Sequence, residues 1–184
     1  TSIGRVPRGY GLPQLLLDME TVGPITRTVR DQALLLNVLA GPDRRDYRSL
    51  GFSKTDFLAE LDHAPGLLRI LAVEQIGDAP VDPEITTSFR QMVDEMSKLG
   101  HHVETGGLPL DVQPIYERWT TIADIGLGLL LQRRPEMAER ASKKYVEWAQ
   151  KSYPATHLLE ILEALDNIRN QAAVAFEEID IIMS

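Results

Sequence analysis

The apolar positions near the N-terminus predict one buried helix with clear signals at both ends. Over residues 28–39 the apolar side chains recur at helical spacing. Thr28 and Asp31, three positions apart, resemble an acidic capping box, and Gly41-Pro42 follows where the helix should stop. The pattern therefore fixes both the start and the end of this helix, and it predicts a turn immediately before it.

The next stretch predicts a strand, an amphipathic helix and a second strand. Residues 68–73 are apolar apart from Arg69, which is typical of a strand buried on both faces of a sheet. Asp82-Pro83 supplies a cap and a first helical residue, and the apolar stripe that follows ends before Gly100. Residues 68–104 therefore predict a β-α-β unit, which forms part of a parallel sheet.

The second half of the chain has helical periodicity. We expect helices over residues 114–131, 135–150 and 156–176, the last of them with a long apolar face. The apolar run over residues 179–183 would then return the chain to the sheet as a strand. An α/β fold with a helical second half follows from this order of elements.

We expect these elements to form a single partial domain over residues 1–184. Its α/β core part is residues 1–107, its helical and variable part is residues 108–178, and residues 179–184 begin the returning strand. The composition, 43% hydrophobic and 25% charged, is typical of a globular domain. The first residue is not Met and the last residues read as a strand without a following turn, so we expect the chain to continue at both ends.

Charge and composition exclude several classes of function. The formal net charge of −8 opposes a nucleic-acid partner, and no apolar run approaches the ~20 residues that a membrane span needs. The chain has no cysteine and no signal-peptide pattern, so we expect a cytoplasmic protein. His101 and His102 are adjacent in a strand and point to opposite faces, which disfavours a metal site. No phosphate loop or dinucleotide motif is visible, so we expect neither metal nor cofactor.

Two phrases of the sequence resemble the amidase signature family of serine amide hydrolases. They are Gly-Arg-Val-Pro at residues 4–7 and Gly-Pro-Ile-Thr-Arg-Thr-Val-Arg-Asp at residues 23–31. The resemblance is strong over residues 3–46, moderate over residues 67–104, weak between 108 and 175, and returns over residues 176–183. Asp18 and Glu20 depart from it, since many members of the family carry Ser and Asp there.

The resemblance implies a mixed or parallel sheet flanked by helices, and hydrolysis of linear carboxylic amides. The family uses a Ser nucleophile, a second Ser in a cis peptide and a Lys base, and its Gly-Gly-Ser stretch lies just upstream of the Gly-Arg-Val-Pro phrase. This chain starts after that point, so it would hold no catalytic residue and would be inactive alone. Its partner would be a small-molecule amide, and a homodimer is a further expectation.

Two other interpretations remain open at this stage. Within the family, the chain could come from the A subunit of a glutamyl-tRNA amidotransferase. In a different class, it could belong to a non-catalytic relative or an interaction module, with the helices after residue 114 as its docking face. The residues encoded ahead of Thr1 would separate these interpretations from the amidase hypothesis.

The candidate substrate-binding residues lie in the turn before the first helix and on one later helix. Ser2 and the other serines lack a Gly-Gly-Ser or Gly-x-Ser-x-Gly setting, which disfavours all of them as nucleophiles. In the turn, free N–H groups at the start of the helix could face a polar substrate group, although the residues could equally just shape the turn. On the later helix, an aromatic residue could line a pocket or belong to the core. The candidates are Gly23, Pro24, Ile25, Thr26, Arg27 and Trp119.

Overall fold

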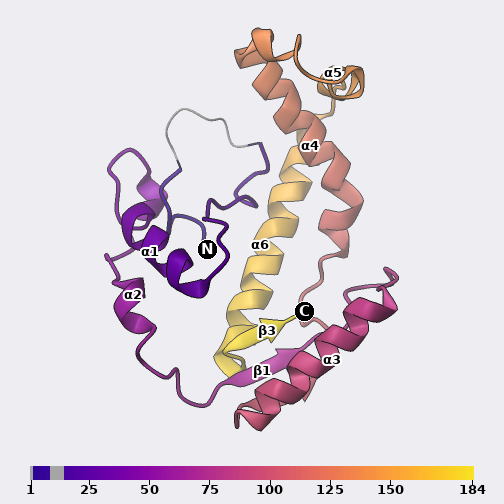
Figure 1. The fold of residues 1–184 in the computed structure, drawn as a ribbon. Helices are drawn as coiled ribbons and strands as arrows, with labels where there is room; N and C mark the ends of the chain where they lie inside the picture. The colour runs from indigo at the N-terminus through magenta and orange to yellow at the C-terminus, as the bar shows by residue number, and fades with distance from the viewer. Residues whose placement is uncertain (1, 9–14) are drawn as a thin grey trace. The chain divides into compact units, whose positions relative to one another are not determined.

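The computed structural model describes residues 2–8 and 15–184, which form two compact units (Figure 1). Unit 1 contains the described residues up to Ala64 together with residues Thr120–Pro154. Unit 2 contains residues Pro65–Trp119 and Ala155–Ser184. Each unit is therefore assembled from two separate stretches of chain.

The centre of unit 2 is a three-stranded parallel sheet with the order β2-β1-β3. Its strands are β1 (Arg69–Ala72), β2 (His102–Thr105) and β3 (Ile181–Met183). The pairing confirms the predicted β-α-β unit and the returning strand. In β1, Ile70 and Ala72 are buried and the two alternate residues are not. The expectation of burial on both faces is therefore wrong for this chain by itself, because only one face of β1 is fully covered.

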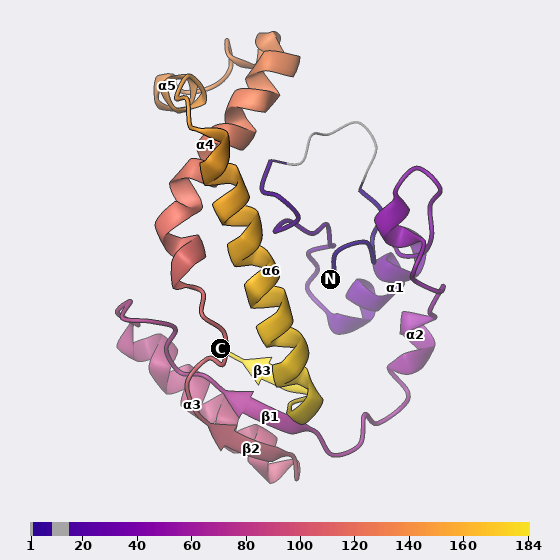
Figure 2. The same ribbon diagram turned by 180° about the vertical axis from the view of Figure 1, so that it is seen from behind.

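Two long helices accompany the sheet in unit 2 (Figure 2). Helix α3 (Pro83–Lys98) joins β1 to β2, and the carboxylate of Asp82 caps it by accepting a hydrogen bond of 2.8 Å from the backbone N–H of Glu84, the second residue of the helix. Helix α6 (Ala155–Glu178) leads directly into β3. Its buried residues are Ile161 and Leu165, whereas Leu159, Leu162 and Phe176 are exposed, so the predicted apolar face of the helix is only partly covered in this chain.

Unit 1 is built around α1 (Val29–Leu39), with a short α2 (Phe57–Glu60) and a 3-10 turn over Tyr47–Ser49. The side chain of Thr28 accepts a hydrogen bond from the backbone N–H three residues later, which confirms the predicted cap. Asn37 ties the two helices together, because its side-chain oxygen accepts the first N–H of α2 at 2.7 Å and its nitrogen donates to the carboxylate that caps α2.

The remaining helices follow residue 112. Helix α4 (Gln113–Arg133) is continuous, with its first residues in unit 2 and the rest in unit 1. The predicted helix over residues 135–150 is wrong: the chain forms a 3-10 turn over Pro135–Met137 and a separate α5 (Lys143–Ala149). The side chain of Ser142 caps α5, and a serine in that role starts a helix rather than continuing one. Among the described helices, none combines the length and apolar character of a membrane span.

Candidate functional site

The Gly23–Arg27 turn lies on the surface of unit 1, directly before α1. Ile25 is fully exposed, and the hydroxyl of Thr26 lies 2.9 Å from the carbonyl oxygen of Thr28, to which it can donate. Arg27 is exposed, and within the described part of the chain its guanidinium group makes no ion pair. The turn is thus shaped by its own backbone and by the helix cap, while two of its side chains face outward.

Trp119 lies in the part of α4 that belongs to unit 2. Its side chain is 45% exposed, and that of Tyr116 on the same helix is 65% exposed. The alternative that these aromatics belong to the core is not what the structure shows. Both side chains lie on the surface of this chain, where each ring offers an apolar face and a polar edge.

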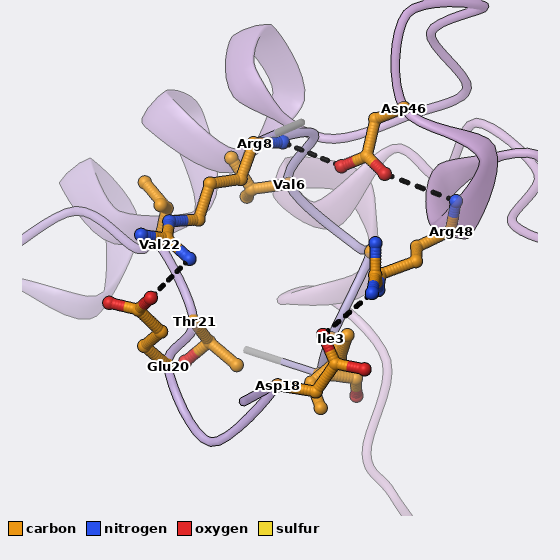
Figure 3. A pocket seen from close by; sticks show the side chains of 11 residues that line it. Ile3, Val6, Arg8, Asp18, Glu20, Thr21, Val22, Asp46 and Arg48 are labelled. Atoms are coloured by element: carbon orange, nitrogen blue, oxygen red, sulfur yellow. Dashed lines mark hydrogen bonds and ion pairs between the residues drawn. The ribbon is translucent and has the colours of Figure 1, made fainter. Parts of the chain in front are cut away.

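A pocket of about 170 Å³ lies in unit 1, against the segment that leads into the Gly23–Arg27 turn (Figure 3). Three stretches of chain line it: residues 2–8, residues 18–22, and the loop that contributes Asp46 and Arg48. The candidate residues predicted from the sequence were those of the turn and Trp119, and none of them lines this pocket. The residues just before the turn therefore form one wall of this pocket.

Asp46 joins two of these three stretches through their backbones. One carboxylate oxygen of Asp46 accepts the N–H of Arg8 at 2.7 Å, and the other accepts the N–H of Arg48 at 3.1 Å. Asp46 is only 5% exposed, so both bonds are shielded from water. A buried carboxylate that accepts two backbone N–H groups fixes the position of both chain segments.

The guanidinium groups of the same two arginines reach the third stretch (Figure 3). Arg8 Nη1 lies 2.6 Å from a carboxylate oxygen of Glu20, and Arg48 Nη2 lies 2.8 Å from one of Asp18. We call these five residues, Asp46 included, the charge ring. From the sequence, Asp18 and Glu20 were noted only as departures from the family pattern. Their pairing with Arg8 and Arg48 depends on the fold, so no local spacing indicated it.

The Gly-Arg-Val-Pro phrase has a structural explanation in the same unit. Gly4 adopts φ +85°, and a side chain there would collide with the backbone carbonyl of Arg48. The guanidinium of Arg5 stacks over the ring of Phe52 at 4.6 Å, and its backbone carbonyl accepts the N–H of Gly41 at 3.1 Å. Arg5 is therefore a packed link between the phrase and the loop after α1.

The buried serine of unit 1 is occupied by structural bonds. Ser49 is fully buried, and its hydroxyl accepts the backbone N–H of Asp43 at 2.7 Å. It also lies 2.8 Å from the backbone oxygen of Asp46, to which it can donate its proton. A nucleophilic serine needs an adjacent base to take that proton and an open path to a substrate. Ser49 has a peptide carbonyl in that place, so it holds the loop instead.

Lys151 is likewise engaged in structure. Its ammonium donates a hydrogen bond of 2.9 Å to Asp124, which is 2% exposed, and this bond raises the pKa of Lys151. Burial raises the pKa of Asp124, but the hydrogen bonds from Lys151 and Tyr153 outweigh it and hold that pKa below its ordinary value. A lysine acts as a general base only when it loses its proton near neutral pH, so this lysine is a poor candidate.

A family model and a solved structure both match this chain over nearly its whole length. The family model described as Amidase matches residues 1–184. The crystal structure of a bacterial aryl acylamidase of the amidase signature family superposes with a TM-score of 0.77 at 26% identity, covering 97% of this chain and 39% of the acylamidase chain. A 6-aminohexanoate cyclic dimer hydrolase shares the fold, with a TM-score of 0.60 at 23% identity over 80% of this chain and 32% of its own.

Curated relatives match the chain over a shorter length. The A subunit of the glutamyl-tRNA(Gln) amidotransferase of Desulforapulum autotrophicum is 39% identical over 114 residues, which are 59% of this chain and 23% of that protein. The corresponding protein of Thermotoga maritima is 29% identical over 100 residues, or 54% of this chain and 21% of its own length. This chain therefore spans less than a quarter of the curated relatives it matches and about two fifths of the acylamidase.

Proposed function

The chain belongs to the amidase signature family, and on that premise we propose that it is a segment of an enzyme that hydrolyses carboxylic amides to an acid and ammonia or an amine. The observation that carries the proposal is the family match over residues 1–184. The acylamidase likeness supports it, because 97% of this chain superposes on an enzyme of the same family.

In this proposal the chemistry and the binding surface come from different parts of the enzyme. Amide hydrolysis needs an activated hydroxyl and donors for the developing oxyanion. The resemblance implies that both come from a Gly-Gly-Ser stretch encoded ahead of residue 4, together with a more distant Lys. The present chain would supply the cleft wall, through the Gly23–Arg27 turn and the N-terminal end of α1.

The exposed side chains of the candidate site fit a substrate-binding role. Arg27 carries a planar guanidinium that can bind a carboxylate or carbonyl oxygen in a bidentate manner, and Ile25 offers an apolar contact beside it. Trp119 would line the apolar part of the substrate pocket and select which amide fits. The partner is then a small-molecule amide, in a cytoplasmic enzyme.

The proposal is tested by comparing two proteins, the 184-residue chain and the product of the complete gene. Both are incubated with a simple aliphatic amide and with an anilide, and release of ammonia or aniline is measured. We expect turnover only from the complete product, and its loss when the Ser of the Gly-Gly-Ser stretch is changed to Ala. Turnover by the 184-residue chain that disappears on substitution of one of its own serines would refute the proposal that the catalytic groups lie outside this chain.

A second candidate function is supported by the names of the relatives. The eight curated relatives compared are all A subunits of glutamyl-tRNA(Gln) amidotransferases, with 29–39% identity to this chain. In that case the enzyme would work in a complex rather than alone or as a homodimer. Affinity purification of the complete product from its native host separates the two: stoichiometric partner proteins favour the amidotransferase, and a homodimer with amidase activity favours the stand-alone enzyme.

A further inference from the structure

We propose that the charge ring positions the Gly23–Arg27 turn for substrate, and that Asp46 is its central positioning residue. The inference rests on the proposed function, because it gives the geometry of the turn a role in substrate binding. It also involves Asp18 and Glu20, the two positions at which the sequence departs from its resemblance to the family.

The connection from the ring to the turn is short. Only Thr21 and Val22 separate Glu20 from Gly23, so the carboxylates of the ring hold the chain within a few residues of the turn. At the other side, the cap made by Thr28 fixes the chain to the start of α1. The turn therefore lies between two fixed segments, the charge ring before it and the capped start of α1 after it. A shift of the segment held by the charge ring would move the turn.

The backbone before the turn needs to be held. Leu17 has φ 48° and Asp18 has φ 65°, and this left-handed conformation is unfavourable for a leucine and more readily adopted by an aspartate. The ion pair from Arg48 to Asp18 and the hydrogen bond from Met19 N–H to the carbonyl oxygen of Leu16 support this backbone. The charge ring thus helps to hold the chain in a conformation that costs free energy at Leu17.

The ion pairs of the charge ring differ from ordinary surface ion pairs because the backbone of both arginines is held in place by hydrogen bonds. Exposed pairs gain little because two long side chains must be ordered together. Here the Arg8 and Arg48 side chains are only 21% and 22% exposed, and Asp46 already holds the backbone N–H of both. Because the backbone is fixed first, each guanidinium has less freedom to lose when it binds its carboxylate. Asp46 therefore acts through the two arginines and not on substrate directly.

The first test is hydrogen exchange on the product of the complete gene, with and without Asp46→Asn. The substitution keeps the size of the side chain but removes one acceptor oxygen. We expect the backbone N–H groups of Leu15, which donates to Glu20 at 2.9 Å, and of Met19 to exchange about tenfold faster, with α1 unchanged. The matched control is Asp43→Asn, which breaks an exposed pair with Arg45 in the same loop. Unchanged exchange at Leu15 and Met19, or equal acceleration in the control, overturns the proposal.

The second test reverses the charges of the Arg8–Glu20 ion pair in the complete enzyme. Arg8→Glu and Glu20→Arg each place like charges together, and we expect KM to rise about tenfold with kcat within about twofold. The double variant restores opposite charges and should bring KM back to within about threefold of the wild type. A fall in kcat at constant KM, or a double variant no better than either single one, overturns the positioning role. If the complete enzyme hydrolyses no amide, the proposed function fails, while the exchange test still decides whether the ring holds its segment.

Discussion

Arg69 and Asp180 are joined by four hydrogen bonds although 111 positions separate them in the chain, and one of them runs from the backbone N–H of Asp180 to the carbonyl oxygen of Arg69 at 2.9 Å. The carboxylate of Asp180 accepts the backbone N–H of Arg69 at 2.8 Å, its Nε at 3.2 Å and its Nη2 at 2.9 Å. The same guanidinium donates to the backbone oxygen of Glu177 at 3.0 Å. One arginine at the start of β1 therefore fixes the end of α6 and the entry into β3.

This pair predicts how stability depends on pH. The hydrogen bonds from Arg69, from its side chain and then from its backbone, lower the pKa of Asp180 to about 2. In the unfolded chain an aspartate has a pKa of about 3.9, so the contribution is fully present above about pH 4 and is lost as the pH falls toward 2. We expect Asp180→Asn to lower Tm at pH 6, and the difference from wild type to shrink between about pH 4 and pH 2. Thermal unfolding followed by circular dichroism measures it.

The control for this pair is Glu178→Gln. Glu178 is 91% exposed and lies 3.9 Å from Arg69, so its removal should change Tm little at any pH. Parallel loss of Tm with pH in wild type and Asp180→Asn would show that the pair contributes nothing to the acid response.

The Arg69–Asp180 pair also shows which features of the fold could be predicted from the sequence and which could not. The β-α-β unit and the strand over Ile181–Met183 could be predicted, because apolar runs and helix punctuation are local signals. In the sequence, Arg69 is only an interruption in an apolar strand, and Asp180 is only one position in the run over residues 179–183 that predicts the returning strand. Their partnership is non-local, since it depends on β3 pairing beside β1, and no spacing rule along the chain indicates it.

The same distinction applies to the candidate site. Thr28, the cap of α1, and the turn before it were predicted from adjacent residues. Asp46 could not be recognised, because its two partners are backbone N–H groups, one of them 38 positions away, and backbone groups have no sequence signature. The single helix predicted over residues 135–150 was wrong for a local reason. The composition of this stretch favours a helix, but the side chain of Ser142 caps a new helix and so divides the stretch in two.

A second prediction concerns the buried carboxylate of Asp124. The Tyr153 hydroxyl donates to it at 2.6 Å, alongside the bond from Lys151. Tyr153→Phe removes one donor from a carboxylate that water cannot reach, so we expect the free energy of unfolding to fall by about 1–2 kcal/mol in urea titrations. Tyr145→Phe is the matched control, because Tyr145 is 50% exposed, and it should stay within about 0.5 kcal/mol of wild type. Equal effects of the two variants would contradict the assignment.

A third prediction reverses the usual effect of replacing glycine in a helix. Alanine is normally favoured over glycine in a helix interior by about 1 kcal/mol. At Gly126 of α4, however, a side chain would collide with the backbone carbonyl of Leu15, so neither partner can simply rotate away. We expect Gly126→Ala to lower the free energy of unfolding by about 1–3 kcal/mol. Gly51→Ala, where no atom lies within 4 Å of the added carbon, should be close to neutral. A stabilising Gly126→Ala would show that α4 does not approach Leu15.

The last prediction tests the anchor on the helix side of the Gly23–Arg27 turn. The Thr28 hydroxyl accepts the backbone N–H of Asp31 at 3.1 Å, and Thr28→Ala leaves that N–H without its partner. We expect a loss of about 1 kcal/mol in the free energy of unfolding, with faster hydrogen exchange confined to the first turn of α1. Thr28→Ser keeps the oxygen and should retain most of the stability. Because the charge ring holds the other side of the turn, exchange at Met19 should stay at the wild-type rate in both variants; acceleration there would mean that the two anchors are not independent.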